Sequence, residues 1–171
     1  MQCRRRTTHK LTNSRVENTD SSNCHRDEEI PPTMLTATSK SHYLWPLSLF
    51  EASNVLEPSQ YYYWNAGRFA PATLRIDIAN TAVYVTRIEL EAVMVPAMGK
   101  VRHEIRLGRT QDTMHTAYWF TGVTIDGECV QIQLVNGTDD LRSRSNILEI
   151  ITHESPSWIA WRRIRVWKAV C

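Results

Sequence analysis

The residues of this chain that could do chemistry are aromatic and hydrogen-bonding side chains gathered in the segment 53–69. Successive side chains of an extended segment alternate in direction, so at least one of its three consecutive tyrosines is expected to face solvent. The alternative is that the aromatic rings fill one end of a core. The segment holds Tyr61, Tyr62, Tyr63 and Trp64 beside Asn54, Gln60, Asn65 and Arg68.

Motifs of catalysis are absent from the sequence. It contains no Gly-x-Ser-x-Gly, no His-Glu-x-x-His and no phosphate-binding glycine loop. Acidic residues such as Asp77, Glu89, Glu91 and Glu104 fall on the polar faces of predicted strands, where solvated charges are expected. We therefore expect a binding protein and not an enzyme, although a site assembled from distant residues leaves no mark in a sequence.

Charge and apolar content limit the partners. The 20 Lys and Arg residues nearly balance the 18 Asp and Glu residues, which gives a net charge of +2 and predicts no nucleic-acid partner. A basic stripe formed by Arg163 and Arg165 is the weak alternative, and a solvated face is the expectation. No apolar run approaches the roughly 20 residues of a membrane span. The four cysteines, at positions 3, 24, 129 and 171, are expected to be free thiols.

The sequence divides into a polar arm and an all-β domain. Residues 1–33 are almost all polar or charged, which predicts a disordered N-terminal arm. Residues 34–171 show short alternating apolar runs separated by Pro, Gly and Asn, which predicts about eight strands in two packed antiparallel sheets. The expected strands are 35–41, 74–78, 83–93, 101–107, 119–125, 129–134, 147–152 and 159–167.

Four blocks in order resemble the discoidin, or coagulation factor V/VIII type C, family. They are the Trp-Asn-x-Gly loop within 63–71, the Pro-Ala turn and His-x-Ile strand within 95–105, the Phe-x-Gly-x-Thr-x-Asp-Gly hairpin at 120–127, and the Ser-Pro-Ser-Trp-x-Ala-Trp strand within 152–166. The last block is similar to bacterial or phage members. The resemblance spans roughly 34–168 and implies a galactose-binding-like, antiparallel jelly-roll β-sandwich.

The resemblance also implies where a ligand binds. Family members commonly hold sugars with loops gathered at one end of the sandwich, and some bind lipid headgroups or proteins. A sugar requires an aromatic face against its C–H groups and several hydrogen-bonding side chains for its hydroxyls. Trp158 and Trp161 are expected to fill the end of the core. The predicted ligand-binding residues are Tyr62, Trp64, Asn65, Arg68, Lys100, Arg102, His103 and His153.

The chain departs from the family at its calcium site. Many members carry an Asp-Gly turn in the first long loop that helps to hold a structural calcium ion, which prefers several oxygen ligands. This turn is missing from the matching segment 54–59, although Asn54 and Glu57 could still supply oxygens. We therefore predict no cofactor.

A glycan or polysaccharide is the expected partner, in a carbohydrate-binding or adhesive role. The alternative is a protein-interaction domain that uses the same loops or a sheet face. No signal peptide is evident in the first residues, which favours that alternative, since family members are usually extracellular or surface-associated. The sequence leaves the localisation and the oligomeric state open.

Overall fold

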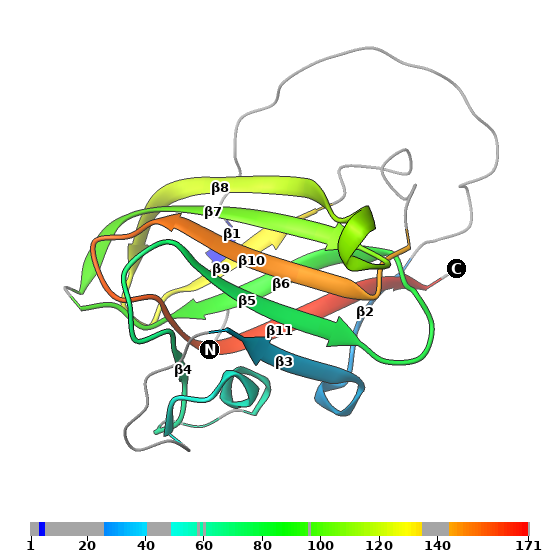
Figure 1. Ribbon diagram of the computed structural model, residues 1–171, viewed down its shortest axis with the longest axis horizontal. Coiled ribbons are helices and arrows are strands. Elements are labelled where there is room, and N and C mark those ends of the chain that lie inside the picture. Colours follow the sequence, from blue (N-terminus) through cyan, green and yellow to red (C-terminus); the bar gives the residue numbers. More distant parts are fainter. Residues whose placement is uncertain are drawn as a thin grey trace, which may run out of the picture.

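The computed structural model describes residues 4–5, 26–40, 49–57, 59, 61–95, 97–134 and 144–170 of the 171-residue chain (Figure 1). Nearly all regular structure in these residues is β-strand, with three short 3-10 helices. The strands are β1 (Arg4–Arg5), β2 (Arg26–Glu29), β3 (Leu35–Ser39), β4 (Trp64–Asn65), β5 (Ala72–Ile78), β6 (Val85–Ala92), β7 (Met98–Gly108), β8 (His115–Ile125), β9 (Cys129–Gln133), β10 (Ile147–Glu154) and β11 (Ala160–Val170). The helices are η1 (Pro32–Met34), η3 (Ala52–Leu56) and η4 (Gln111–Thr113).

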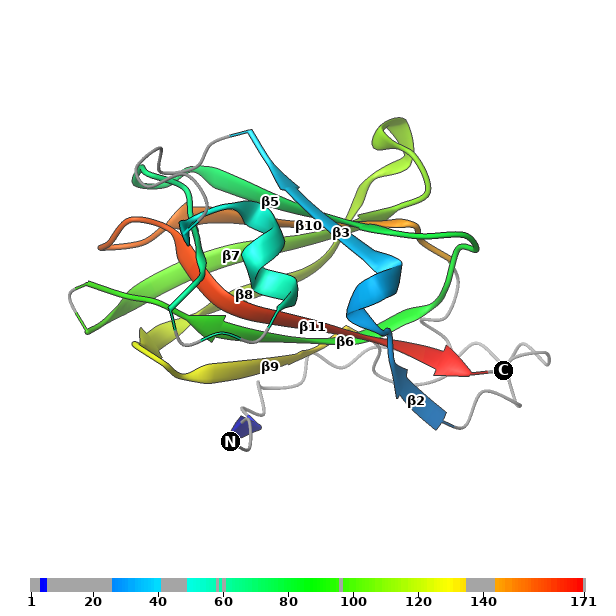
Figure 2. The ribbon, with the colours of Figure 1, turned by 90° about the horizontal axis from the view of Figure 1, so that it is seen from below.

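Two sheets pack face to face, as the sequence predicts. One sheet has the order β3-β5-β10-β7-β8, and the other has the order β1-β9-β6-β11-β2 with β4 paired to β11. All pairings are antiparallel except the short one between β1 and β9. Figure 2 shows η3 between β3 and β11, where its Val55 is fully buried. The predicted jelly-roll β-sandwich is confirmed, and all eight predicted strands are present.

Alternation along the strands builds the core. In β5, Leu74 and Ile76 point inward and are fully buried, while Arg75 and Asp77 point outward and bond to each other. The facing sheet contributes Ile88 in the same way. Burying one such side chain stabilises the fold by about 1.5–3 kcal/mol, so the apolar face of each strand fixes its register.

Part of the predicted arm, residues 1–33, has regular structure. Residues 26–29 form β2, an edge strand paired with the end of β11. Ile30 follows with a buried side chain, and its backbone N–H donates to the carbonyl of Val166 at 2.8 Å. The strand was missed because cross-strand ion pairs, such as Glu28 with Lys168 at 3.7 Å, stabilise it in place of an apolar pattern. Residues 31–33 lead into β3 through η1, and of residues 1–25 only β1 is among the described residues.

One further expectation changes. Cys129 is disulfide-bonded and not a free thiol, while the other three cysteines lie outside the described residues. The basic stripe of Arg163 and Arg165, which the sequence offers as the weak alternative, carries less positive charge than the sequence indicates. Arg165 pairs with Glu29 and with Glu89, at 3.0 Å in the second case. Within the described part of the chain, no helix is long and apolar enough to cross a membrane.

Candidate functional site

Four loops meet at one end of the sandwich, at the left of Figure 1. Residues 93–97 join β6 to β7, and 126–128 join β8 to β9. The Asp126 carboxylate accepts a hydrogen bond from the Met94 N–H at 2.8 Å, and the Asp126 N–H donates to the Ala97 carbonyl at 2.7 Å. These hydrogen bonds join the two loops and fix their positions relative to each other at this end of the molecule.

The segment before β5 is fixed against the start of β11. The Ala66 N–H donates to the Ile159 carbonyl at 2.8 Å, and the Ile159 N–H donates to the Arg68 carbonyl at 3.2 Å. Between them Gly67 has a φ of 65°, a left-handed conformation that favours glycine, and its N–H donates to the Asn65 side chain at 2.8 Å. The turn therefore places Asn65, Arg68 and the residues after them beside the final loop.

The final loop, 155–159, lies against the beginning of β7. A Cβ atom at Gly99 would come within 2.1 Å of the Pro156 ring, so only glycine permits this approach. The Ser157 N–H donates to the Ser155 hydroxyl at 3.2 Å, which is the local hydrogen bonding that the Ser-Pro-Ser motif predicts. This close approach brings Trp158 to the surface at the same end as the other loops.

The loop 93–97, the segment before β5 and the final loop line a hollow with a volume of about 310 Å³. Phe69 and Trp158 meet edge to face at one side, with ring centroids 6.5 Å apart, and remain 57% and 40% exposed. Among the described residues, none of those that line the hollow is charged. Such a surface can stack against an apolar face and form a few neutral hydrogen bonds. The lining residues are Tyr63, Asn65, Phe69, Val93, Val95, Pro156, Ser157, Trp158 and Ala160.

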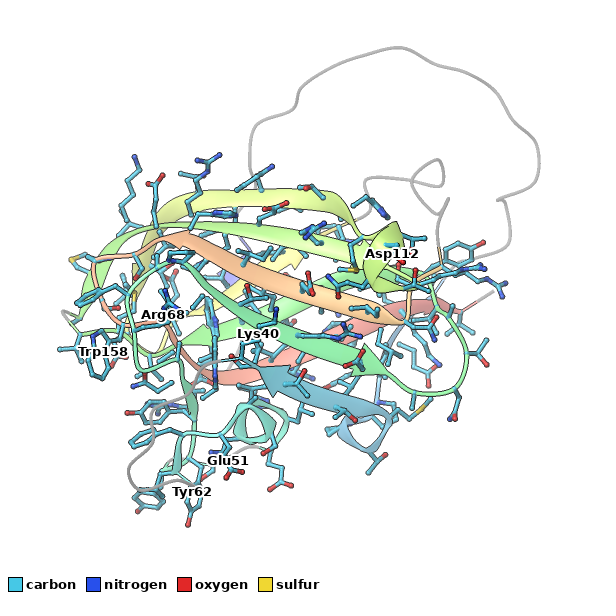
Figure 3. All side chains as sticks on the ribbon, in the orientation of Figure 1. Lys40, Glu51, Tyr62, Arg68, Asp112 and Trp158 are labelled. Atoms are coloured by element: carbon cyan, nitrogen blue, oxygen red, sulfur yellow. The ribbon has the colours of Figure 1, made fainter. Side chains whose placement is uncertain are left out.

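The structure separates the residues predicted from the 53–69 segment. Asn65 lines the hollow, and Figure 3 shows Arg68 at the same end as Trp158. Tyr62 is exposed, and Figure 3 shows it away from both of these residues; Tyr63 lines the hollow instead. Gln60 lies outside the described residues.

Trp64 does not belong to the surface. Its side chain has no exposed area, and its strand β4 pairs with β11 so that Trp64 stands opposite Trp161 in the core. A ligand has no access to its ring, so we do not retain Trp64 as a candidate. Its inward direction follows from the alternation along β4, which directs Asn65 outward.

Arg102 and His153 lie on the outer face of the five-stranded sheet, in a second group that includes Trp119. The Arg102 guanidinium carbon lies 4.3 Å from the centre of the Trp119 ring, and the His153 ring lies 5.2 Å from it. His153 Nε2 is 2.8 Å from the Glu104 carboxylate. We call Arg102, Glu104, Trp119 and His153 the outer-face network. Lys100 is exposed on β7, two residues before Arg102.

Glu104 is the centre of the outer-face network. It accepts hydrogen bonds from Thr116 and His153, and Arg106 lies 3.8 Å away. Burial raises the pKa of the Glu104 carboxyl, but the hydrogen bonds from Thr116 and His153 and the nearby positive charges outweigh it, so the pKa is lower than usual. The carboxylate is therefore held ionised by its neighbours.

His103 points to the opposite side of the same strand. It is buried between the sheets, where its ring stacks on Phe120 and meets Trp161 edge to face. Burial lowers the pKa of His103 to about 3, with a smaller contribution from His153, so the ring is neutral at ordinary pH. His103 therefore has no contact with the surface that was predicted to bind a ligand.

Phe69 and Trp158 in the hollow, and Trp119 on the sheet, are absent from the predicted site residues. Trp161 fills the core as expected, but Trp158 does not. The two tryptophans are three positions apart in a segment that enters a strand, and alternation places residues of odd separation on opposite sides. That spacing is the signal that could have separated them.

The described residues contain no group of three or more His, Cys, Asp or Glu side chains placed to hold a metal ion. Asn54, which was considered as a calcium ligand, belongs to η3, and Glu57 follows that helix with an exposed side chain.

No protein-family model and no curated protein matches the sequence. Several solved structures match over most of the chain. A family 32 carbohydrate-binding module of NanJ from Clostridium perfringens, solved with galactose, is 13% identical with a TM-score of 0.67, and the match covers 84% of this chain and 100% of the module.

Two further structures agree. An F5/8 type C domain from Bacteroides fragilis is 7% identical with a TM-score of 0.68, over 85% of this chain and 98% of that domain. A second Clostridium perfringens family 32 module, solved with GalNAc-β-1,3-galactose, is 8% identical with a TM-score of 0.66, over 81% of this chain and 99% of the module. The chain therefore has the discoidin-like β-sandwich fold of the F5/8 type C domains and the family 32 carbohydrate-binding modules.

Proposed function

We propose that this chain is a non-catalytic carbohydrate-binding module that holds a saccharide in the hollow. The observation that carries the proposal is the exposed pair Phe69 and Trp158 at the wall of an uncharged concavity. Its volume, about 310 Å³, lies at the lower end of the range of roughly 300–1,000 Å³ typical of small-molecule sites. The similarity to modules solved with galactose and with GalNAc-β-1,3-galactose supports it.

The chemistry of the lining suits a sugar. Either aromatic ring can pack against the C–H face of a pyranose, and the Asn65 amide and the Tyr63 hydroxyl supply donors and acceptors for its hydroxyls. Arg68 adds a guanidinium at the same end, and no carboxylate in the described part of the chain forms an ion pair with it. This composition favours neutral or acidic saccharides over cationic ones.

A binding role in place of a catalytic one rests on the same lining. Hydrolysis of a glycosidic bond generally uses two carboxyl groups that flank it. Within the described residues, the lining contains no carboxylate, imidazole or thiol. We infer that the hollow retains its ligand unchanged.

The test is a glycan array followed by titration calorimetry with the best ligand. Trp158→Ala is expected to lower the affinity by roughly tenfold or more, because it removes an exposed ring from the wall of the hollow. Trp119→Ala is the matched control, since Trp119 has nearly the same exposure, 43% against 40%, on another surface. An array without any hit, or an equal loss in both variants, would contradict the proposal.

One observation favours the alternative of a protein-interaction domain. Trp119, Val123 and Ile125 lie on one face of the edge strand β8, and all three are 43% exposed. Met98 stands opposite Ile125 on β7 and extends this apolar stripe. Capture of a partner from the native host, lost in Trp119→Ala and retained in Trp158→Ala, would assign the function to this face.

A further inference from the structure

Cys129 forms a disulfide bond, and the strands around it limit which cysteine can be its partner. It begins β9, where Val130 and Ile132 point into the core, so Cys129 lies on the outer face of the six-stranded sheet. The other three cysteines are at positions 3, 24 and 171. None of these three is among the described residues, but each follows or precedes a described strand by one or two residues, and this short tether limits its reach.

The register of the sheet excludes Cys171 as the partner. Cys129 pairs with Glu91 on β6, and Glu91 pairs with Arg163 on β11, so these residues lie level across three adjacent strands. Val170 comes seven positions after Arg163 in β11, a distance of about 23 Å at the usual strand rise of roughly 3.3 Å per residue. The next residue can return at most about 3.8 Å of this distance, whereas a disulfide needs Cα atoms within about 7 Å of each other.

The same distance excludes Cys24. Arg26 stands opposite Val170 on β11, so it lies about as far from Cys129 as Val170 does. Figure 2 shows β2 beside the end of β11, away from β1 in dark blue. The two residues from Arg26 back to Cys24 span at most about 7.6 Å, which is too short to bring Cys24 within about 7 Å of Cys129.

Cys3 is the cysteine that can reach. β1 pairs with β9 in parallel, with Arg4 opposite Val130 and Arg5 opposite Gln131. The same register, continued by one residue, sets position 3 against position 129. Neighbouring strands lie roughly 4.8 Å apart, within the range of roughly 4.4–6.8 Å between the Cα atoms of a disulfide. β1 consists of two arginines and has no apolar side chain to bury, so a covalent bond accounts for its attachment to β9.

The opposite edge of the same sheet brings the remaining two cysteines into reach of each other. Arg26 at the start of β2 stands opposite Val170 at the end of β11. Cys24 precedes Arg26 by two residues, and Cys171 follows Val170 by one. The antiparallel register, continued past these strand ends, offsets the two cysteines by one residue. Such an offset across neighbouring strands separates Cα atoms by about 6 Å, which a disulfide can span.

We propose that the four cysteines form two disulfide bonds, Cys3 with Cys129 and Cys24 with Cys171, which tie the N-terminal arm to both edges of the six-stranded sheet. To form each bond, two thiols lose two protons and two electrons to an oxidant, such as the disulfide of oxidised glutathione, which leaves as two thiols. Disulfides persist in oxidising compartments and are rare in the cytosol. The pairing therefore assigns the chain to an oxidising compartment, whatever ligand the hollow binds.

Peptide mapping of the full chain tests the pairing. The reduced protein is incubated with a mixture of reduced and oxidised glutathione at the ratio of the secretory pathway, its free thiols are blocked with N-ethylmaleimide, and it is digested with trypsin. Every cysteine then lies in its own peptide, so each linkage has a distinct mass; the peptides are 1–4, 16–26, 110–142 and 169–171. We expect 1–4 linked to 110–142, and 16–26 linked to 169–171. Any other linkage, or recovery of these peptides with blocked thiols, would overturn the proposal.

Urea unfolding of variants gives a second readout. Cys3→Ala and Cys129→Ala break the same bond, so each should lower the unfolding midpoint by the same amount, and the double variant should lower it no further. Cys24→Ala is the matched control, because it breaks the other bond and its shift should add to that of Cys3→Ala. With a reductant present, all variants should unfold at the wild-type midpoint. Additive shifts for Cys3→Ala and Cys129→Ala would contradict a bond between these two residues.

The compartment is tested in the native host. Cells are treated with a permeable alkylating reagent before lysis, and the chain is then isolated and mapped as above. We expect the peptide 110–142 to be recovered in its disulfide-linked form. An alkylated Cys129 would overturn the assignment to an oxidising compartment, even if the purified protein forms both bonds.

Discussion

The hollow and the outer-face network each present a tryptophan of nearly equal exposure, yet their surroundings are opposite. Trp119 lies under the Arg102 guanidinium and beside the His153 ring. Trp158 stands with Phe69 at the wall of a concave, uncharged space. A ligand at the first surface must fit around this ion-and-ring cluster, while a ligand at the second can pack into the hollow. Exposure alone therefore does not identify a binding aromatic residue.

Topology explains the difference. On a sheet face, cross-strand pairing sets side chains at fixed spacings, so Glu104 lies opposite Trp119 and Arg102 lies opposite Glu154, to which it forms an ion pair of 3.7 Å. At the end of the sandwich the chain turns at Gly67, and strand pairing does not set the spacing of side chains between the loops. Charged side chains that pair with one another are thus expected on the sheet face, and room for a ligand is expected among the loops.

The largest expected effect is a loss of stability in acid, which we attribute to His103 and not to His153. His103 is buried beneath the hollow with a pKa of about 3, well below its usual value. As the pH falls, His103 therefore takes up a proton in the unfolded chain before it does so in the folded chain. Its contribution to the free energy of unfolding is fully present above about pH 6.5 and is lost as the pH drops toward 3. Over that window we expect a loss of roughly 3–5 kcal/mol, measured by urea unfolding at pH 7, 5.5 and 4.

His103→Gln should flatten this pH dependence, because glutamine does not titrate. His153→Gln is the matched control, since His153 lies at the surface in the outer-face network. It should leave most of the slope between pH 6.5 and 3 in place. Equal slopes in the wild type and in His103→Gln would show that the burial of His103 does not govern acid unfolding.

A smaller effect is expected from Glu104→Gln, in the outer-face network. It removes the charge that holds Arg106 and His153 on a side chain that is only 13% exposed, so the free energy of unfolding should fall by about 1–2 kcal/mol at pH 7. Because the pKa of Glu104 is lowered, its contribution is present above the usual carboxyl pKa and is lost as the pH falls through the lowered value. The difference from wild type should therefore shrink in acid.

Glu154→Gln serves as the control for this prediction. Glu154 is 55% exposed and its ion pair with Arg102 is long, so the effect on unfolding should lie within about 1 kcal/mol of zero. Neither variant should change the affinity for a saccharide. A loss of sugar binding in Glu104→Gln would move the site from the hollow to the outer face.

The same physical rules explain how much of this arrangement was predictable. Alternation in β5 and β6 identified the core, because one apolar face must be buried. Alternation in β7 also contained the position of His103, which shares its inward face with Val101 and Ile105 and should have been assigned to the core. Local patterns sufficed wherever a long strand set the direction of the side chains.

Prediction failed where contacts between distant segments decide the outcome. Trp64 is buried because β4 pairs with β11, almost a hundred positions later, and a two-residue strand has no readable pattern. The hollow depends on the approach of Gly99 to Pro156. Which loops share an end of a sandwich follows from the order of the strands in the two sheets, and composition does not reveal that order.

The smallest expected effect concerns Phe69, the other ring of the hollow. An aromatic contact contributes about 0.5–1.5 kcal/mol, so Phe69→Ala should weaken saccharide binding roughly two- to tenfold. Its ring is 57% exposed, so the unfolding transition in urea should hardly move. Val123→Ala, on the outer face of β8, is the control and should leave the affinity unchanged. If calorimetry gave the same affinity for Phe69→Ala and wild type, the ligand would have to pack against Trp158 alone.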